Sequence, residues 1–386
     1  MNKQFYILIL MFSFQIFSQE RYLDEVFPEY EKTENVVYGN APDLPFIFLF
    51  EWNTVDIDLD IDIYEPAGDT LEDRPVIVFL HAGAFFSGNN ELDDVVDLSI
   101  SAAKRGYVAV NVNYRLGLNI LSTYSGERAV YRGVQDASAV IRYLREYHED
   151  LNIDSDKIFL WGSSAGSLIT LHLAYSDDDE RPQSTFGGFG DPDLGCVNCS
   201  GNNFSHSNKP TAIVSCWGAI GELDWIEADD NIPAIMFHGT SDVVVPYDSG
   251  LPFTINIALP IVYGSNQIHE KLDELNIQNE VYIEEGEPHE YWGTLNGNWA
   301  GGPNEYFYQI QNDSYNFLYQ FLDIGSNELL GDINNDQIVN ILDIIVIVDY
   351  VINNEYISIA DVNADNTLNI LDIILIVNII IGDDRE

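Results

Sequence analysis

The chain has 386 residues, of which 46% are hydrophobic and 12% aromatic, enough for a sizeable packed core and too many for wholesale disorder. It carries 63 Asp and Glu residues against 16 Lys and Arg residues, which gives a net charge of −47. Such a surface repels phosphate backbones and argues against a nucleic-acid-binding role. Most of this charge is typical of a solvated surface, although acidic side chains at the right spacing can also hold calcium.

The first residues have the pattern of a secretory signal peptide. Lys3 gives a positive start, Phe5–Phe17 is almost wholly apolar, and the small residue Ser18 stands where a cleavage site is expected. The apolar run is shorter than the roughly 20 residues of a membrane-spanning helix. The sequence therefore predicts that residues 1–18 are removed and that a secreted or periplasmic protein with no membrane segment begins near Gln19. An uncleaved anchor is the alternative.

Strands alternate with helices along residues 54–322. Strands are predicted, from runs of apolar residues or from alternation, at 54–64, 75–80, 107–112, 157–161, 211–217, 232–237 and 280–284. Helices are predicted at 129–148, 168–175, 269–275 and 306–322. Segment 54–64 alternates acidic and apolar residues, which predicts a half-exposed strand. This order of elements is typical of an α/β fold with a mainly parallel sheet.

The alternation breaks at Ser176–Pro210, a stretch rich in Asp, Gly, Asn and Ser. A loop of this length is often functional, and the sequence leaves open whether it faces a site or is a passive insertion. Cys196 and Cys199 form one C-x-x-C within it, and because no second pair is spaced for zinc, a local disulfide is predicted. Cys216 lies in an apolar run and is predicted to be buried.

The run Gly162-Ser163-Ser164-Ala165-Gly166 joins a predicted strand to a predicted helix. This G-x-S-x-G pattern is typical of a nucleophile elbow, where the tight turn requires small residues around the serine. Upstream, His81–Gly88 follows a buried strand, and its glycine-containing turn can direct backbone N–H groups at an oxyanion. Ser164 is therefore a candidate nucleophile.

Two later residues complete a candidate catalytic set. Asp242 lies just after the predicted strand 232–237, where a carboxylate can orient a histidine. Its competitors for that role are Glu222, Asp224 and Asp248. His289 lies on the loop after the last strand, where it can act as a general base toward Ser164. The chain order Ser, Asp, His is that of an α/β-hydrolase.

Residues 50–324 resemble the carboxylesterase branch of the α/β-hydrolase superfamily. The residues that carry the resemblance are His81–Gly88, Val112–Gly117, the pair Gln135 and Asp136, and Gly162–Gly166. The resemblance implies Ser164 as nucleophile, Asp242 as acid and His289 as base, with no cofactor for catalysis. It also implies oxyanion donors from the backbone of Ala165 and of the turn Gly83–Ala84. The sequence departs from the family at Ala82 and Ala84, where relatives carry consecutive glycines, and this leaves the pair of donors open.

The C-terminal part contains a repeated acidic unit, with copies that begin at Gly331 and Ala360. Each copy has oxygen-bearing residues at positions 1, 3, 5, 7, 9 and 12 of an EF-hand-type loop, a spacing that suits Ca²⁺. The predicted ligands are Asp332, Asn334, Asp336, the Ile338 carbonyl, Asn340 and Asp343, then Asp361, Asn363, Asp365, the Thr367 carbonyl, Asn369 and Asp372. An apolar helix is predicted after each loop.

Residues 331–382 resemble a dockerin, a paired-loop module that binds cohesin domains. This resemblance implies a small all-α module with two structural Ca²⁺ sites and a cohesin-type protein partner. The alternative is a calcium-stabilised tail without a protein partner.

Together these patterns predict a signal peptide at 1–18, an α/β-hydrolase domain at 19–324 and a linker with a dockerin-like module at 325–386. The predicted activity is that of a serine carboxylesterase on small-molecule or carbohydrate-linked esters, such as feruloyl or acetyl esters. Two alternatives stay open: a serine peptidase on the same fold, and an inactive binding protein on a hydrolase scaffold.

Overall fold

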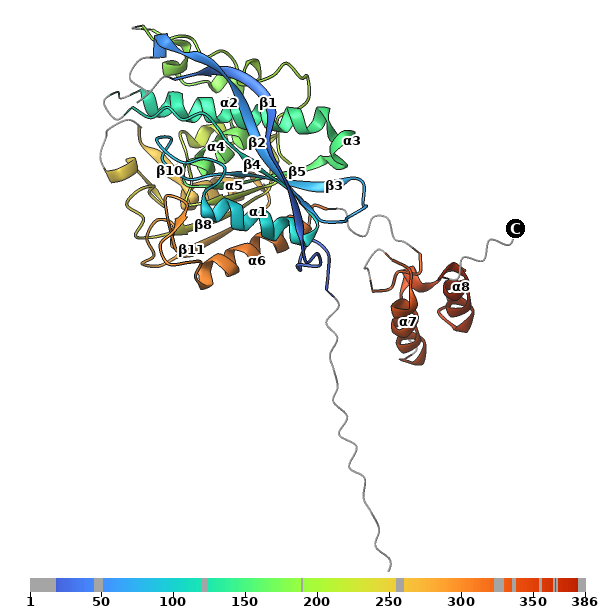
Figure 1. The fold of residues 1–386 in the computed structure, drawn as a ribbon. Coiled ribbons are helices and arrows are strands. Elements are labelled where there is room, and N and C mark those ends of the chain that lie inside the picture. The colour runs from blue at the N-terminus through green and yellow to red at the C-terminus, as the bar shows by residue number, and fades with distance from the viewer. Residues whose placement is uncertain are drawn as a thin grey trace, which may run out of the picture.

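A twisted eight-stranded sheet lies between two layers of helices in the computed structural model (Figure 1). The structure describes residues 19–44, 51–119, 122, 124–188, 190–254, 260–322, 330–334, 338–353, 356–363, 365 and 367–380. The predicted signal peptide therefore lies outside the described residues. Among the described helices, none combines the length and apolar character needed to cross a membrane.

The strand order of the sheet is β1-β2-β4-β3-β5-β6-β8-β11. These strands are β1 Tyr30–Asp43, β2 Val55–Pro66, β3 Arg74–Leu80, β4 Val108–Val112, β5 Ile153–Ser163, β6 Ile213–Cys216, β8 Ala234–Gly239 and β11 Asn279–Glu284. All neighbours from β4 to β11 pair in parallel, whereas β1 and β2 add two antiparallel strands at one edge. The mainly parallel α/β sheet predicted from the sequence is confirmed.

Helices cover both faces of the sheet. They are α1 Asp93–Arg105, α2 Ser125–Glu146, α3 His148–Leu151, α4 Ala165–Tyr175, α5 Ser265–Leu275 and α6 Glu305–Tyr319. On β3, Val76 and Val78 face the core layer that contains α2 and α4, whereas Ile77 and Phe79 face the layer that contains α1 and α6. Because both faces are covered, every residue of β3 and β4 is buried.

The remaining strands are short. They are β7 Ala219–Ile220, β9 Ser249–Gly250, β10 Val262–Gly264, β12 Thr294–Leu295 and β13 Asn298–Trp299. The first three form a small sheet in the order β7-β10-β9, and β12 pairs with β13. These pairs stiffen the segments that follow β6, β8 and β11.

The prediction of a half-exposed strand at 54–64 is wrong in its second half. The first four residues of β2 are exposed, but from Leu59 onward nearly all side chains are shielded. Leu59, Ile61 and Ile63 pack into the core layer that contains α2, and Tyr64 packs into the layer that contains α1. Two of its acidic residues find partners there. Asp62 lies 2.9 Å from the Lys32 ammonium, and Asp60 accepts a hydrogen bond from Asn113 at 3.3 Å. These two acidic side chains of β2 therefore have ion-pair or hydrogen-bond partners in a neighbouring strand and loop.

The strand β1 and the helix α1 were not predicted from the sequence. Signals for α1 were present: Asp93 and Asp94 begin it, Lys104 and Arg105 end it, and Gly106 follows in a left-handed conformation with φ 106°. This charge order complements the helix dipole, and glycine is the usual residue at a helix C-terminus.

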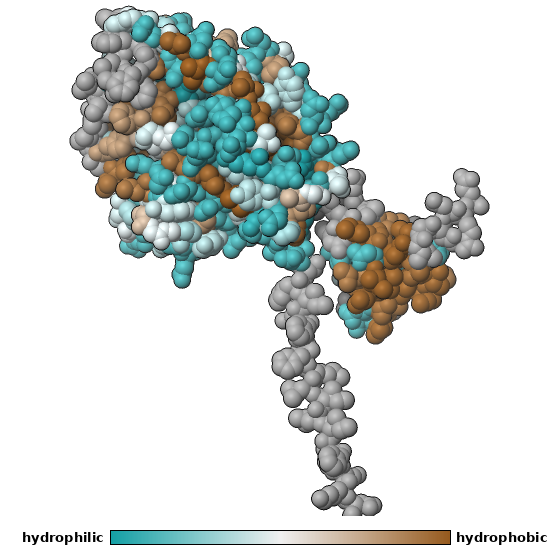
Figure 2. All heavy atoms as spheres, viewed as in Figure 1, coloured by the Kyte–Doolittle hydropathy of each residue, from teal (hydrophilic) through white to brown (hydrophobic). Residues whose placement is uncertain are grey.

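The repeat region forms two apolar helices, α7 Ile341–Asn353 and α8 Ile370–Ile380, as predicted. Its interior is a separate small cluster around Ile347, Ala360 and Ile376. Many other apolar side chains of the two helices are exposed, and Figure 2 shows them as a continuous brown surface. A pair of helices this short buries little apolar area by itself.

Candidate active site

Ser164, Asp242 and His289 meet at the carboxyl end of the parallel sheet. Ser164 follows β5, Asp242 comes three residues after β8, and His289 comes five residues after β11. Because the carboxyl ends of parallel strands lie at one edge, side chains that are far apart in the sequence converge there. The three residues proposed for catalysis from sequence are therefore brought together.

Hydrogen bonds connect the three side chains in a line. His289 Nδ1 lies 2.6 Å from Asp242 Oδ2, and His289 Nε2 lies 2.8 Å from Ser164 Oγ. Because a carboxylate only accepts, Nδ1 carries the proton and donates it to Asp242, which leaves Nε2 to accept from the serine hydroxyl. This is the arrangement needed to remove a proton from Ser164.

The elbow around Ser164 is held by close backbone packing. Ser164 itself has φ 53° and ψ −115°, a strained conformation at the start of α4. A Cβ added at Gly162 would lie 2.3 Å from the Gly166 carbonyl oxygen, and one at Gly166 would lie 2.0 Å from that of Leu80. The two glycines are therefore required because strand and helix pass too closely for any side chain.

The turn proposed to supply the oxyanion donors lies beside the elbow. The Gly166 N–H donates to the His81 carbonyl at 3.1 Å, which ties α4 to the start of this turn. Gly83, Ala84 and Phe85 have φ values of 125°, 53° and 56°. The alanine that departs from the family pattern thus occupies a left-handed conformation that normally favours glycine, at a cost of about 1–2 kcal/mol.

Contacts from β4 and the segment after it hold this turn in place. The Tyr114 hydroxyl donates to the His81 carbonyl at 2.7 Å, and the N–H groups of Gly117 and Leu118 donate to the Phe85 carbonyl at 2.8 and 3.0 Å. Ala84, Ser164 and Ala165 line a common small cavity. The predicted donor residues therefore lie next to the candidate nucleophile.

Asp242 is fully buried and surrounded by donors. Its Oδ1 accepts the N–H groups of Val244 and Val245 at 2.7 and 2.9 Å, and His238 Nε2 lies 3.3 Å from Oδ2. Although burial alone would raise the pKa of Asp242, the hydrogen bonds from His238 and His289 hold it well below the usual carboxyl range. Asp242 therefore stays ionised and keeps His289 in the productive tautomer.

Trp217 supports the ring of His289 from the side. It follows β6, and its ring meets those of His289, Tyr291 and Trp292 edge to face at centroid distances of 6.2, 5.2 and 4.7 Å. Its indole N–H donates to Ser163 Oγ at 3.1 Å. The sequence analysis missed Trp217, because it belongs to no motif that includes Ser164, Asp242 or His289. His238, in contrast, lies four residues before Asp242 at the same strand end, where a structural hydrogen-bonding role can be predicted.

Two cavities in this part of the molecule share some of their lining residues. The smaller has a volume of about 30 Å³ and is lined mainly by apolar side chains, with Ser164 in its wall. The larger has a volume of about 820 Å³, and Leu168 and Val262 line both. The insert Ser176–Pro210 contributes Asp177, Arg181 and others to the larger cavity. The sequence left open whether the insert faces a site or is a passive insertion. Part of the insert forms a wall of this cavity.

A stripe of polar side chains on α2 anchors the insert. Six residues at alternating spacings of three and four contribute to it, namely Arg128, Tyr131, Gln135, Ser138, Arg142 and Arg145. For example, Arg128 donates to the Pro192 carbonyl at 2.7 Å, and Arg142 donates to the Asn202 carbonyl at 2.9 Å. The insert is thus held along the length of one helix.

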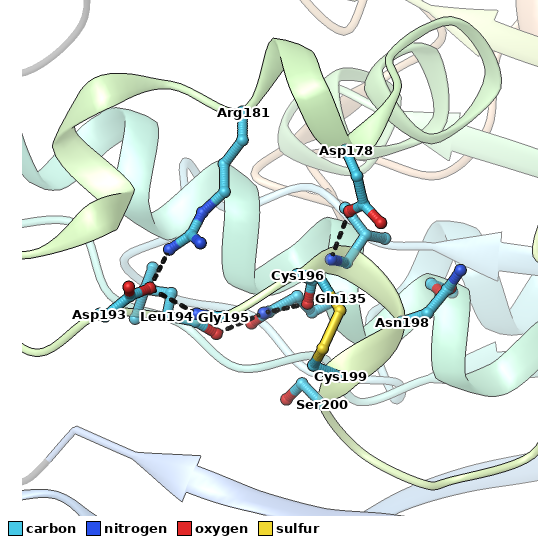
Figure 3. Close-up of a disulfide and its surroundings, with 12 residues drawn as sticks. Gln135, Asp178, Arg181, Asp193, Leu194, Gly195, Cys196, Asn198, Cys199 and Ser200 are labelled. Atoms are coloured by element: carbon cyan, nitrogen blue, oxygen red, sulfur yellow. Dashed lines mark hydrogen bonds and ion pairs between the residues drawn. A yellow bond between two sulfur atoms is a disulfide. The ribbon is translucent and has the colours of Figure 1, made fainter.

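The predicted disulfide between Cys196 and Cys199 is present, and Cys216 is buried as expected. Figure 3 shows the disulfide beside the stripe on α2, with Gln135 reaching the carbonyls of Leu194 and Cys196. Asp178 accepts the Val197 N–H at 2.8 Å on the other side of the turn. The disulfide therefore closes a turn that is already fixed from two directions.

In each predicted calcium loop, backbone N–H groups donate to the last aspartate. Asp343 accepts the N–H groups of Ile333, Asn334 and Asn340, and the equivalent Asp372 accepts those of Asn363 and Asn369. The predicted ligand Asp336 lies outside the described residues. Within the described ranges, no three His, Cys, Asp or Glu side chains are grouped so that they could hold a metal.

Comparisons with known proteins agree with this architecture. Residues 61–223 match the family model described as BD-FAE. Juvenile hormone esterase of Tribolium castaneum is 31% identical over 117 residues, and carboxylesterase 3B of Mus musculus is 33% identical over 120 residues. These matches cover 30% and 31% of this chain but only 20% of each relative's own length.

A structural comparison covers a larger part of the chain than these sequence matches. Esterase 2 of Thermogutta terrifontis, phosphorylated by paraoxon, aligns with a TM-score of 0.51 and 21% identity, over 76% of this chain and 95% of that one. At this identity the likeness shows the fold. This chain is therefore similar to carboxylesterases in part of its sequence, and it shares its fold with a solved esterase.

Proposed function

We propose that the protein is a secreted serine carboxylic ester hydrolase that works through an acyl-enzyme. The observation that carries the proposal is the continuous line of hydrogen bonds from Asp242 through His289 to Ser164, at 2.6 and 2.8 Å. A serine hydroxyl is a weak nucleophile unless a base removes its proton, and His289 is placed and oriented to do so.

In the first step His289 Nε2 takes the Ser164 proton while Ser164 Oγ attacks the ester carbonyl. The N–H groups of Ala165 and of the Gly83–Ala84 turn would donate to the oxyanion, and one such donor typically contributes about 100- to 1000-fold in rate. His289 then gives the proton to the leaving alcohol. In the second step a water molecule, deprotonated by His289, releases the acid and restores Ser164.

The proposal is tested by Ser164→Ala, assayed with a short aryl ester. We expect hydrolysis to fall to the background rate while circular dichroism stays that of the parent protein. A fluorophosphonate probe should label the parent protein and leave Ser164→Ala unlabelled. Activity retained in the variant would refute the proposal, and an unlabelled, inactive parent would favour the binding-protein alternative. Cleavage of peptide anilides but not of esters would favour a peptidase.

The substrate class we propose is a small or carbohydrate-linked ester, such as an acetyl or feruloyl ester. Support comes from the larger cavity, whose volume of about 820 Å³ exceeds what a simple aryl ester fills. Further support comes from the dockerin-like repeat, since such modules belong to polysaccharide-degrading assemblies.

We also propose that the repeat region at 331–382 holds two structural Ca²⁺ ions. The residues present fit this role, because Asp332, Asp343, Asp361 and Asp372 are at most 4% exposed. The sequence has no Lys, Arg or His between residues 325 and 384. Backbone N–H groups satisfy part of these carboxylates, a bound cation would balance their charge, and oxygen ligands at this spacing suit Ca²⁺.

A cohesin-type protein is the partner that we propose for this region. The support is a set of exposed apolar side chains that repeats from one helix to the next. On α7 these are Ile341, Leu342, Ile345 and Val348, and on α8 the residues 29 positions later are Ile370, Leu371, Ile374 and Val377. Apolar surface of this kind is typical of a protein-binding face.

For location we propose a secreted or periplasmic protein with residues 1–18 removed. The signal-like pattern of these residues supports the proposal, as does the Cys196–Cys199 disulfide, because disulfides persist in oxidising compartments. N-terminal sequencing of protein recovered outside the cytoplasm should read from Gln19 or close to it.

A further inference from the structure

Two buried carboxyl groups near His289 have no role in the proposed mechanism. Glu290 follows His289 in the chain and is 5% exposed, and Asp94, in the first turn of α1, is 0% exposed. Burial, and after it the charge of Glu290, raises the pKa of Asp94 well above its usual range. Buried acids are costly, and those with strongly shifted pKa values gather at functional sites.

Gly297 connects these two residues. It lies in the turn between β12 and β13, its N–H donates to Glu290 Oε2 at 3.4 Å, and its carbonyl accepts the Asp94 N–H at 3.0 Å. A Cβ added at Gly297 would lie 3.0 Å from Asp94 Oδ1 and 2.7 Å from Leu92 Cδ1. The turn is therefore packed against the start of α1, which brings Glu290 and Asp94 to the same place.

The rest of the β12–β13 hairpin is bound to the same helix. The Trp299 N–H donates to Asp93 Oδ2 at 2.9 Å, and its indole N–H donates to Asp97 Oδ2 at 2.8 Å. Glu290 has φ 52°, a left-handed conformation that is strained for a residue with a side chain. Its carbonyl accepts the Gly293 N–H at 3.2 Å. The segment that follows His289 is thus held on α1 in one strained conformation.

The two carboxyl groups differ in the donors around them. Burial raises the pKa of Glu290, while the positive charge that His289 can take up opposes this rise. The Gly297 N–H and the Thr294 hydroxyl also favour the charged form of Glu290. Asp94 Oδ1 accepts one N–H of α1 at 2.8 Å, whereas its Oδ2 has no hydrogen-bond partner among the described residues. Two carboxyl groups in one buried site do not both ionise, so Asp94 keeps the proton and Glu290 the charge.

Three other titratable groups act on this pair. Tyr114 and Cys216 are neutral near pH 7, because burial raises the pKa of each. Asp93 lies at the exposed start of α1. Among the described groups that act on the pair, His289 is therefore the one that takes up positive charge, and it does so when it removes the proton of the nucleophile.

We infer that Glu290 is a positioning residue, whose carboxylate holds the His289 segment on α1 and stabilises the positive charge that forms on His289, while Asp94 stays protonated. This inference rests on the proposed esterase activity and adds a second carboxylate that acts on its base. Asp242 contacts His289 directly, whereas Glu290 acts through its charge. Because His289 becomes positive only as the reaction proceeds, this charge favours the transition state over the ground state.

The test is the pH profile of kcat/KM for an aryl acetate in Glu290→Gln. This variant keeps the shape of the side chain and an acceptor for the Gly297 N–H, and it loses the charge. We expect the midpoint of the acid limb to move down by about one pH unit and kcat at the optimum to fall about three- to tenfold. Glu290→Asp keeps the charge and should keep the midpoint of the parent protein. Loss of the holding contact alone would lower the rate at every pH and leave the midpoint in place.

A second measurement does not depend on turnover. The downfield proton resonance of His289 Nδ1–H, assigned by its absence in His289→Gln, reports the titration of this ring directly. Its midpoint should move down by the same amount in Glu290→Gln. It should stay in place in Asp94→Asn, since a neutral amide then replaces a neutral acid.

The matched control is Glu287→Gln. Glu287 precedes His289 by two residues in the same segment, is only partly buried, and accepts a hydrogen bond from the Tyr306 hydroxyl at 3.2 Å. The variant removes the same charge from a position in contact with solvent, so its midpoint should be that of the parent protein.

A parent protein without activity on any ester would refute the proposed function, and the resonance of His289 would still test the inference. Equal midpoints in the parent protein and Glu290→Gln would overturn the inference and leave the esterase activity in place. A downward shift of the same size in Asp94→Asn would also overturn it, because Asp94 would then carry the charge.

Discussion

Among the three residues proposed for catalysis, Asp242 has the most supporting contacts, since two backbone N–H groups and two histidines surround its carboxylate. Asp242→Asn would keep the shape but turn one oxygen into a donor, which favours the wrong tautomer of His289. We expect kcat to fall by about 10³- to 10⁴-fold with little change in KM. Stopped-flow assays with an aryl acetate would measure this, and a fall below tenfold would contradict the assigned role.

His81 gives a pH prediction at the same scale. It is fully buried, and burial lowers its pKa to about 4 from an ordinary value near 6.5. Between pH 6.5 and pH 4, His81 binds a proton in the unfolded chain but not in the folded chain. The free energy of unfolding is therefore highest above pH 6.5 and decreases as the pH falls toward 4.

We therefore compare the parent protein with His81→Phe, which keeps a ring against Tyr114 and cannot titrate. The difference in free energy of unfolding should move in favour of the variant by about 3 kcal/mol between pH 7 and pH 4. Urea titrations at several pH values would measure it. A difference that does not change with pH would show that His81 is not buried in its neutral form.

The proposed triad could be predicted from sequence because each member lies within five residues of the end of a strand, and Ser164 also lies in a short motif. Ser164 is marked by glycines that the close approach of Gly166 to Leu80 requires. Trp217 could not be predicted in the same way. Its role depends on which side chains the sheet order brings next to it, and nothing in its local sequence records that.

At the scale of elements, the elbow depends on the contact between α4 and β3. Gly166→Ala would put a Cβ within 2.0 Å of the Leu80 carbonyl oxygen, so the helix and strand would have to separate. A displacement of this size at a nucleophile costs about 100-fold in kcat/KM. Gly301→Ala, where a Cβ meets nothing within 4 Å, is the control and should have parent activity. Unchanged activity in Gly166→Ala would show that the elbow adapts.

The polar stripe on α2 leads to a second prediction for elements. Arg142 donates to the carbonyls of Ser200 and Asn202 and to the Asn202 side chain. Arg142→Met would leave these acceptors unpaired and should lower the free energy of unfolding by about 2–4 kcal/mol. Limited proteolysis should cut first within 176–210. Arg142→Lys should be affected less, and equal protease resistance in Arg142→Met and the parent would contradict an anchoring role.

The α2 helix was predicted from its apolar periodicity. That its polar face binds the insert at 176–210 was not predicted. A basic side chain on a helix usually faces water, whereas here Arg128 and Arg142 are about 1% exposed. Apart from Glu51, which Arg128 also contacts, their acceptors lie about 60 residues later in the chain, in a segment without regular periodicity. The edge strand β1 was missed for a related reason, since few of its side chains are buried and its apolar signal is weak.

At the scale of the whole molecule, much of the net charge of −47 remains solvated surface. Within the repeat region, however, four aspartates are buried without a basic residue in the same segment. If this region holds the proposed Ca²⁺ ions, EDTA added to the full chain should abolish an early thermal transition, because the metal would no longer balance the buried carboxylates. Hydrolysis of an aryl acetate should not change.

The matching variant is Asp343→Ala combined with Asp372→Ala, which should lack the early transition with or without Ca²⁺. Calorimetry with added CaCl₂ and with added MgCl₂ would separate a calcium site from a general effect of divalent cations. Parallel loss of ester hydrolysis on adding EDTA would contradict a purely structural role for the metal.

The anchoring of the insert has a consequence for how the enzyme could change. The acceptors that α2 binds are mostly main-chain carbonyls, such as those of Ser184, Pro192, Gly195 and Ser200. Every amino acid offers a carbonyl, so the side chains along 176–210 can be exchanged while the attachment to α2 remains. Libraries randomised at cavity-facing positions such as Asp177 and Gln183 should therefore stay folded and yield new substrate preferences. The same freedom would let related proteins diverge in specificity while α2 and the catalytic residues stay constant.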